Sequence, residues 1–317
     1  MAQKQTLVGI DIAKEKVDAA IRFGAEASFA NSREGHRELL VWLKEHDVGK
    51  AVMEASGGYE RSWARLLRGA GLEVTIVDPK RFRHFAKSAG QLAKNDPIDA
   101  RMIAWFGEVF GQSPGQPHDP ERQQLDQMVT ARLGIVRLKE QIQSWAEHEQ
   151  PKAVQRAHQA LLKAVTTQLA KLEAIIAAKI ETTERFAQRA EIIQSVPGVS
   201  DNAAAGLIAF LPELGLVDRQ AASALLGVAP FDADSGKWHG ERHIQGGRKK
   251  LRKLLFMPIL GAATQHNPVL KACYQRLIAK GKKAKVALIA CMRKLIVILN
   301  TMLARGEKWD AARHATA

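Results

Sequence analysis

Four acidic residues have the types and spacing that phosphoryl-transfer chemistry needs. Asp11 closes a short apolar run, TLVGID, and Glu54 closes a second one, KAVME. Asp96 and Asp99 lie three residues apart in NDPIDAR, so on a helix that begins near Pro97 they share one face. Carboxylates gathered in this way repel one another unless a cation lies between them, and hard divalent ions prefer oxygen ligands. We therefore expect a Mg²⁺ or Mn²⁺ site, for which a metal pair roughly 4 Å apart is the usual arrangement in phosphoryl transfer.

Each of these acids taken alone has a simpler interpretation. A single carboxylate is commonly a solvated surface group or a helix cap, and for Asp96 alone the cap is the better explanation. The specific signal is the set of four on one ordered frame of strands and helices. Alternating and helical apolar periodicity predicts that frame, in the order βββαβαβα. The expected strands are 6–11, 16–23, 27–31, 50–54 and 72–77, and the expected helices are 33–46, 61–70, a stretch from 80, and 97–110.

The rest of the chain reads as helical. Residues 111–120, GQSPGQPHDP, carry three prolines and two glycines and predict a linker after the domain 1–110. Residues 121–190 follow as a helical hairpin or coiled coil broken at Pro151, and 191–317 form a mainly α C-terminal domain. Within 191–210 the helix–turn–helix pattern around Pro197 fits a phosphate-binding helix-hairpin-helix or an ordinary αα-corner equally well. A heptad seam supports the coiled coil and comprises Leu162, Val165, Leu169, Leu172 and Ile176.

Positive charge is concentrated near the C-terminus. The 317 residues have a formal net charge of +14, and the segment between Glu241 and Glu307 holds 15 Lys and Arg with no Asp or Glu. A polyanion is the natural partner for such a segment, because each phosphate contact releases condensed counterions. The alternative is a basic surface that only confers solubility. The candidate phosphate contacts are Arg242, Arg248, Lys249, Lys250, Arg252, Lys253, Lys282, Lys283 and Lys285.

Composition also narrows the cellular setting. Two cysteines without a C-x-x-C motif exclude a disulfide scaffold and a cysteine-built zinc site. The best membrane candidate, 286–303, is interrupted by Arg293 and Lys294, and the N-terminal segment has no apolar signal core. We expect a cytoplasmic, nucleoid-associated bacterial protein that does not enter a membrane.

The motifs GIDIAKEKVD, MEASGGYE and NDPIDAR together resemble the Asp-Glu-Asp-Asp signature of one transposase family. It is the insertion-sequence one-hundred-and-ten family, whose N-terminal domain is RuvC-like with a ribonuclease H fold. SVPGVSDNAAAGLIAFL and ALLGVAPFDADSGKWHGERHIQGGRKKLRKLLFMP resemble the C-terminal transposase domain of the same family. The family is related to Piv-type DNA invertases and contains recombinases guided by a bridge RNA. The resemblance implies an α/β ribonuclease-H-like first domain and a transposase or site-specific recombinase.

The resemblance also implies roles for individual residues. Asp11, Glu54, Asp96 and Asp99 match the metal-binding acids, and Ser235 in Asp-Ser-Gly matches the catalytic serine, which alone would suggest only a turn. A serine can divide strand exchange into two transesterifications through a phosphoserine. Since serine and acids lie in different domains, the family implies a composite site, within one chain or between subunits of a dimer or tetramer. The expected partners are donor DNA, target DNA and a structured bridge RNA.

Two observations keep alternatives open. The chain has Gly-Gly-Arg at 246–248 where many members have a lysine and a single glycine, which resembles the subgroup named for insertion sequence eleven-eleven. The same acids also suit a structure-selective nuclease of the Holliday-junction-resolvase type, in which Ser235 has no catalytic part. A non-catalytic nucleic-acid-binding module is the third possibility, against which the intact acids count.

Overall fold

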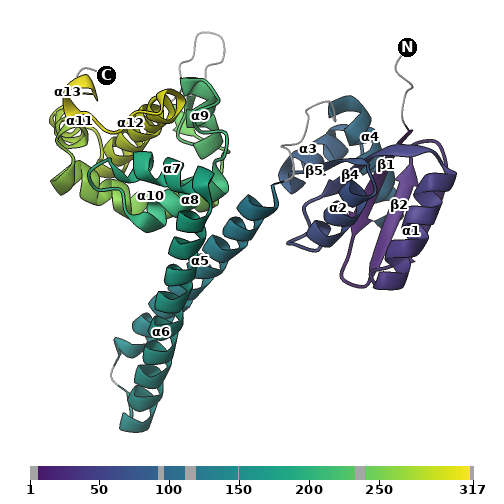
Figure 1. The fold of residues 1–317 in the computed structure, drawn as a ribbon, viewed down its shortest axis with the longest axis horizontal. Coiled ribbons are helices and arrows are strands. Elements are labelled where there is room, and N and C mark those ends of the chain that lie inside the picture. The colour runs from purple at the N-terminus through teal and green to yellow at the C-terminus, as the bar shows by residue number, and fades with distance from the viewer. Residues whose placement is uncertain are drawn as a thin grey trace. The chain divides into compact units, whose positions relative to one another are not determined.

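The computed structural model describes residues 6–91, 96–110, 119–148, 150–232, 240 and 242–314, without the side chains of residues 96–98 and 314. The chain forms two compact units, Met1–His118 and Asp119–Ala317 (Figure 1). Each unit has its own hydrophobic core and is described by itself.

The first unit is built on a five-stranded mixed sheet. The strand order is β3-β2-β1-β4-β5, in which β1 to β3 pair antiparallel and β4 and β5 continue from β1 in parallel. The observed strands are β1 (Thr6–Ile12), β2 (Lys16–Ile21), β3 (Glu26–Ala30), β4 (Val48–Glu54) and β5 (Glu73–Val77). The five strands expected from the sequence are confirmed, with small shifts at their ends.

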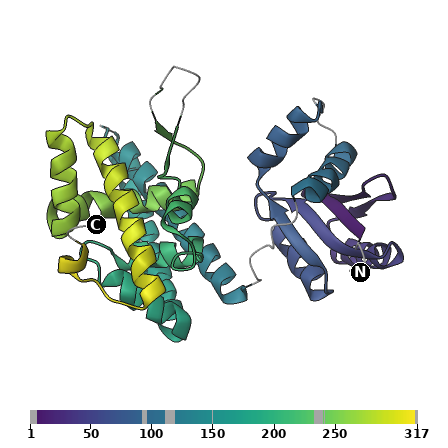
Figure 2. The same ribbon diagram turned by 90° about the horizontal axis from the view of Figure 1, so that it is seen from above.

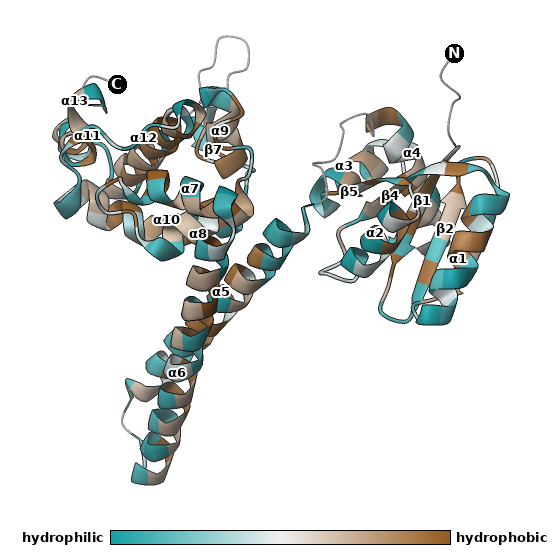
Figure 3. Ribbon diagram, in the orientation of Figure 1, coloured by the Kyte–Doolittle hydropathy of each residue, from teal (hydrophilic) through white to brown (hydrophobic). Residues whose placement is uncertain are grey.

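Helices cover both faces of this sheet. Val8, Ile10 and Ile12 of β1 pack in one core with residues of α1 and α2, whereas Leu7 packs in a second core with residues of α3 and α4. This division follows from the twofold alternation of side chains along a strand. Figure 3 shows the hydrophobic positions of the strands between these helices. The helices are α1 (Arg33–Glu45), α2 (Glu60–Gly69), α3 (Pro79–Ser88) and α4 (Asp96–Phe110).

The second unit is mainly helical. Two long helices, α5 and α6, pack against each other and share one core with the C-terminal helices through Leu125, Val129, Ile176 and Ile180. The structure thus joins the helical pair to the C-terminal domain, which the sequence had separated at residue 190. The helices are α5 (Pro120–Ala146), α6 (Lys152–Thr182), α7 (Glu184–Gln194), α8 (Asp201–Phe210), α9 (Arg219–Leu226), α10 (Lys249–Gly261), η1 (Ala262–His266), α11 (Pro268–Ala279), α12 (Ala284–Arg305) and α13 (Ala311–His314). A short pair of strands, β6 (Pro230–Phe231) and β7 (His243–Ile244), accompanies them.

The helical pair fits one of the two arrangements favoured by the sequence. Ile176 is buried and the other four residues of the heptad seam are half-buried on α6, while most of their neighbours are exposed. A helical hairpin accounts for this pattern. The supercoil that a heptad seam implies stays a prediction.

The turn between α7 and α8 has a packing role. Gly198 has a φ of 87°, and a Cβ there would lie 2.7 Å from the Ala262 side chain. The Asn267 side-chain amide donates to the Pro197 carbonyl oxygen over 3.4 Å. The structure therefore gives this turn the role of a tightly packed αα-corner, and a helix-hairpin-helix that binds phosphate is not confirmed.

Helix α12 is long and apolar enough to cross a membrane by length and composition alone. More than half of its apolar stretch is buried inside the second unit, where it packs beside α11 (Figure 2). Burial in a protein core explains its composition.

Candidate active site

Asp11 and Glu54 lie side by side at one end of the sheet. The parallel pairing of β1 with β4 matches Ile10 to Met53, and the next residue on each strand is the acid. Asp11 is four residues after Leu7 on β1, and Glu54 is two residues after Val52 on β4. Because every second residue of a strand points to the same face, both acids lie on the face that packs on α3 and α4. Two carboxylates predicted from separate motifs are therefore brought together by the topology.

Helix α4 brings Asp99 to the same face. A Cβ on Gly9 of β1 would lie 2.1 Å from the Ala100 carbonyl oxygen and 2.3 Å from the Ala104 nitrogen, so only glycine permits this close crossing. Asp99 shares a helix side with Ile103, which packs with Val52 of β4. Asp99 is thus on the side of α4 that faces the strands of Asp11 and Glu54.

Asp96 is the first residue of α4, one helical turn before Asp99, and its side chain lies outside the described residues. Ser235 also lies outside them. The structure therefore brings together three of the four predicted acids.

The donor set suits a hard divalent cation by its chemistry, because it offers carboxylate oxygens alone. Asp11, Glu54 and Asp99 are half-buried, and each has a polar or electrostatic partner in the structure. Among the side chains that the structure describes, no three carboxylate, imidazole or thiol groups are close enough to enclose an ion as they stand. The three acids therefore suit a divalent cation by the type of ligand they offer and by their location on one face of the sheet.

Asp18 is a fourth acid near this site that sequence reasoning missed. It pairs directly with Asp11 across β1 and β2 and is 5% exposed. The Ser28 hydroxyl donates to its carboxylate, and the Lys16 ammonium lies 3.1 Å away. These partners compensate its charge, so Asp18 supports the sheet beside Asp11.

A buried carboxylate shapes the loop that follows Glu54. Glu60, at the start of α2, is 7% exposed, and its Oε2 accepts from the Ser56 N–H at 3.0 Å and the Gly58 N–H at 2.8 Å. The Ser56 hydroxyl donates to the same oxygen at 3.2 Å. Gly57 and Gly58 both have positive φ, which lets the chain turn tightly around this acceptor. Sequence reasoning missed Glu60, although an acid in the first turn of a helix was the available signal.

We predict that Glu60→Ala lowers the free energy of unfolding by about 2 kcal/mol, because two N–H groups lose their buried acceptor. Cleavage should then need more Mg²⁺, since the chain beyond Glu54 is no longer held. Glu60→Gln retains an acceptor oxygen, so its free energy of unfolding and its Mg²⁺ requirement should lie between those of the wild type and Glu60→Ala. Urea unfolding and a Mg²⁺ titration of strand cleavage measure these effects, and a Glu60→Ala variant equal to wild type in both would contradict the loop's role.

Two family models match parts of this chain. The model of the Asp-Glu-Asp-Asp domain of IS110 transposases, described as a transposase, matches residues 8–145. A second model, described as a transposase of the IS116/IS110/IS902 family, matches residues 190–275. The chain belongs to the IS110 family of transposases. It is an enzyme of DNA recombination, and its first unit has the ribonuclease-H-like fold of the Asp-Glu-Asp-Asp domain.

Curated relatives of this transposase point the same way. The pilin gene-inverting proteins of Moraxella bovis and Moraxella lacunata are each 26% identical over 322 residues, covering 98% of this chain and 99% of the relative. An IS110 insertion-element protein of 43.6 kDa from Streptomyces coelicolor is 31% identical over 153 residues, which cover 47% of this chain and 36% of that protein. The similarity to the inverting proteins extends over both units.

Two arginines of the transposase's basic segment, Arg248 and Arg252, form hydrogen bonds with groups of the protein itself. The Arg248 guanidinium pairs with both carboxylate oxygens of Glu213, one of them at 2.6 Å. Burial raises the pKa of Glu213, but the hydrogen bonds and charge of Arg248 outweigh burial, so its pKa lies below the ordinary value. A depressed carboxyl pKa stabilises the folded state at neutral pH, and this contribution is lost as the pH falls through that pKa.

Arg252 binds the backbone beside the Gly246-Gly247 pair. Its Nη1 donates to the carbonyl oxygens of Gly227 at 2.8 Å and Gly246 at 3.1 Å. Gly246 and Gly247 have positive φ, and a Cβ on Gly247 would lie 2.2 Å from the Gly227 nitrogen. Both glycines and Arg252 therefore serve the packing of the α9–α10 connection.

The remaining candidate phosphate contacts differ in their surroundings. Arg242 pairs with Asp232 at 2.6 Å, and the Lys250 ammonium lies 3.2 Å from the Thr130 hydroxyl. Lys249 also has a partner. The remaining exposed lysines are Lys253, Lys282, Lys283 and Lys285, of which the last three lie where α11 connects to α12.

We predict that Lys282→Gln combined with Lys283→Gln lowers the slope of log K against log salt by about two units on duplex DNA, because each phosphate contact contributes roughly 0.9. Lys163→Gln with Lys171→Gln removes the same charge from exposed positions on α6 and is the matched control. Filter binding between low and moderate salt provides the slopes. Equal slopes for the two double variants would assign Lys282 and Lys283 to a merely solvated surface.

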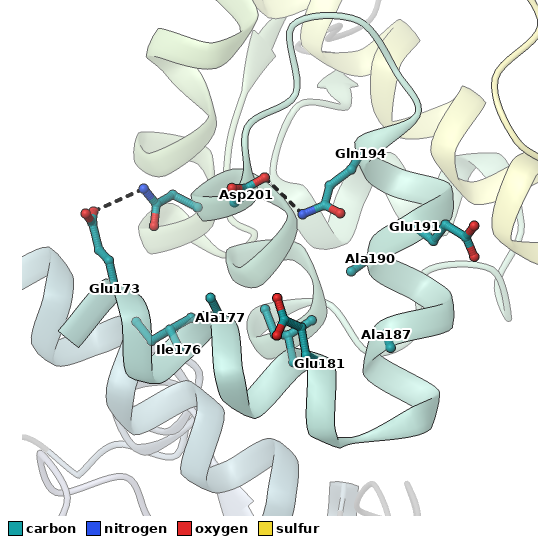
Figure 4. A pocket seen from close by; sticks show the side chains of 11 residues that line it. Glu173, Ile176, Ala177, Glu181, Ala187, Ala190, Glu191, Gln194 and Asp201 are labelled. Atoms are coloured by element: carbon teal, nitrogen blue, oxygen red, sulfur yellow. Dashed lines mark hydrogen bonds between the residues drawn. The ribbon is translucent and has the colours of Figure 1, made fainter. Parts of the chain in front are cut away.

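A pocket of about 400 Å³ lies between α6, α7 and α8 in the second unit (Figure 4). Its lining includes the acids Glu173, Glu181, Glu191 and Asp201. Asn202 donates to Glu173 at 3.1 Å and Gln194 to Asp201 at 3.0 Å. Arg132 pairs with Glu173 at 2.7 Å and Lys308 pairs with Glu191, so ion pairs within the second unit compensate part of this negative charge.

Proposed function

We propose that this transposase cuts and rejoins DNA strands through a phosphoserine at Ser235, with a divalent metal held by Asp11, Glu54, Asp96 and Asp99. The observation that carries the proposal is the convergence of Asp11, Glu54 and Asp99 on one face of the sheet. A bound divalent cation gives three carboxylates from three elements a reason to share one face, because a cation between them offsets the repulsion of like charges.

The reaction conserves the number of phosphodiester bonds. In the first step Ser235 Oγ forms a bond to phosphorus, the P–O bond of one strand breaks, and the serine proton passes to a general base while the leaving sugar oxygen gains a proton. In the second step a strand hydroxyl attacks the phosphoserine, gives up its proton, and releases the protonated serine hydroxyl. The covalent intermediate keeps the bond energy while strands exchange.

The acids have a defined task in this scheme. A bound divalent ion would stabilise the charge of the reacting phosphoryl group. Asp11 and Glu54 come from neighbouring strands and Asp99 from a helix that crosses them closely at Gly9, so a rigid frame positions all three.

Guidance and assembly complete the proposal. We propose that a structured bridge RNA pairs with donor and target DNA, and that the transposase works as a dimer or tetramer of the eleven-eleven subgroup. The exposed lysines where α11 connects to α12 supply charge for phosphates in either nucleic acid. Sequencing of RNA that co-purifies with the full chain tests guidance, and light scattering tests assembly.

The decisive experiment is the trapping of a protein–DNA adduct that resists denaturant. The enzyme is incubated with donor and target DNA in Mg²⁺, denatured, and resolved by electrophoresis with labelled DNA. A resolvase-type nuclease would nick DNA without an adduct, and a non-catalytic module would do neither.

A further inference from the structure

The first unit carries a continuous series of contacting side chains, in which an exposed phenylalanine stacks on an arginine, three aromatic rings follow, and a second arginine ends the series. The Arg22 guanidinium lies 4.6 Å from the Phe23 ring centre and 4.7 Å from the Trp105 ring centre. The ring centres of Trp105 and Phe85 lie 5.1 Å apart, and those of Phe85 and Phe110 lie 5.7 Å apart. Arg81 lies 5.2 Å from Phe110 and ends the series. We call these six residues the aromatic–arginine ladder, which runs from the β2–β3 turn over the C-terminal part of α4 to α3.

Phe23 presents the free end of the ladder to solvent. It is 93% exposed at the turn, where the Gly24 N–H donates to the Ile21 carbonyl oxygen. Its φ is 57°, a left-handed conformation that costs a bulky residue about 1 kcal/mol or more. Phe23 therefore contributes little burial and adds strain, and glycine at this position would favour the fold.

Arg22 is oriented beneath Phe23 by a partner of its own. Glu108 of α4 accepts from the Arg22 guanidinium, and this contact holds the guanidinium beside the Phe23 and Trp105 rings. A cation between aromatic faces is an arrangement on which a further flat ring can stack. The ladder is thus prepared to extend by one ring at Phe23.

Helix α3 adds positive charge at the other end of the ladder. Lys80, Arg81, Arg83 and Lys87 are exposed, and the helix contains no acidic residue. Residues 1–110 as a whole carry only a small net positive charge, which conceals this local concentration in the sequence. An exposed ring stacked on an arginine, in a series that ends beside a basic helix, matches how proteins bind single-stranded nucleic acid, with bases on rings and phosphates on cations.

We propose that the ladder and the basic side chains of α3 bind a nucleic-acid strand, one unpaired base of which stacks on Phe23. The turn lies at the opposite end of β1 from Asp11, because Val8 pairs with Ile21. Asp11 is three residue steps along the strand from Val8, or about 10 Å. The stacked base is therefore held a few nucleotides from the predicted metal site. This proposal rests on the DNA recombination activity of the family and needs neither Ser235 nor a metal.

The test compares Phe23→Gly with the wild-type chain in EDTA, so that binding is measured without cleavage. The probes are a labelled single-stranded DNA, the same strand made abasic at successive positions, and an RNA of the same sequence. We expect Phe23→Gly to bind the intact DNA about tenfold more weakly, the size of one lost stacking contact. One abasic position should weaken the wild type by a similar factor and leave Phe23→Gly unchanged.

Controls separate stacking from folding and from protein contacts. Phe23→Tyr keeps the ring and should bind nucleic acid like wild type. Leu216→Ala removes a similarly exposed apolar side chain from the second unit and should leave nucleic-acid affinity unchanged. Phe23→Gly should melt at the same temperature as wild type or higher. If Phe23→Gly weakens the affinity for RNA more than the affinity for DNA, the bound strand is a guide RNA. If it weakens the affinity for DNA more, the bound strand is DNA.

Two results would overturn the proposal. One is equal affinity of wild type and Phe23→Gly for both nucleic acids. The other is a change of oligomeric state in Phe23→Gly with nucleic-acid affinity intact, which would make Phe23 a contact between protein chains.

Discussion

Asp11→Asn, Glu54→Gln and Asp99→Asn are each expected to slow strand cleavage by a factor of about 10³ or more. Each change keeps the shape of the side chain and removes a charged oxygen ligand, so a bound metal loses stabilisation of the transition state rather than contacts to DNA. Affinity for DNA in EDTA should stay within about twofold of wild type. Single-turnover cleavage in Mg²⁺ and in Mn²⁺ provides the rates.

Glu38→Gln is the matched control for these three variants. Glu38 is exposed on α1, which covers the other face of the sheet from Asp11 and Glu54. It should cleave at the wild-type rate. Full cleavage by any of the three acid variants would remove that residue from the metal site, and full cleavage by all three would remove the site.

Ser235→Ala is expected to abolish both the covalent adduct and recombination. In the proposed scheme the Ser235 hydroxyl is the group that attacks phosphorus in line, and the positioning of such a nucleophile supplies a large part of the rate. DNA binding should persist because the substitution removes no charge. Ser144→Ala removes an exposed hydroxyl from α5 of the same unit and should leave the adduct unchanged.

The two sets of variants together distinguish the candidate mechanisms. A recombinase that uses Ser235 fails in both sets, whereas a resolvase-type nuclease fails only with the acid variants and nicks DNA normally as Ser235→Ala. Thermal unfolding of every variant is measured first. Robust cleavage by folded Ser235→Ala would transfer the function to hydrolysis.

The sequence by itself determined the frame of the first unit. Alternation in residues such as Val8, Ile10 and Ile12 gives the strands, and breaks at Gly57-Gly58 and Pro79 end or begin elements, so these positions depend on local physics. It also placed Asp11 and Glu54 at strand ends, which lie together once the strands pair in parallel. Ser235 is different, because only its resemblance to a family motif distinguishes it from a turn residue.

Only the tertiary structure decided what the charged and aromatic residues do. Arg248 is bound to Glu213, 35 positions earlier, and Trp105 meets Arg22 from 83 positions away. No periodicity in the chain encodes such pairs, so a run of arginines and lysines looks uniform in sequence although Arg248 and Arg252 hold loops and Lys282 and Lys283 face solvent. The physical reason is that burial and ion pairing depend on distances in space, which the order of residues fixes only after the helices have packed.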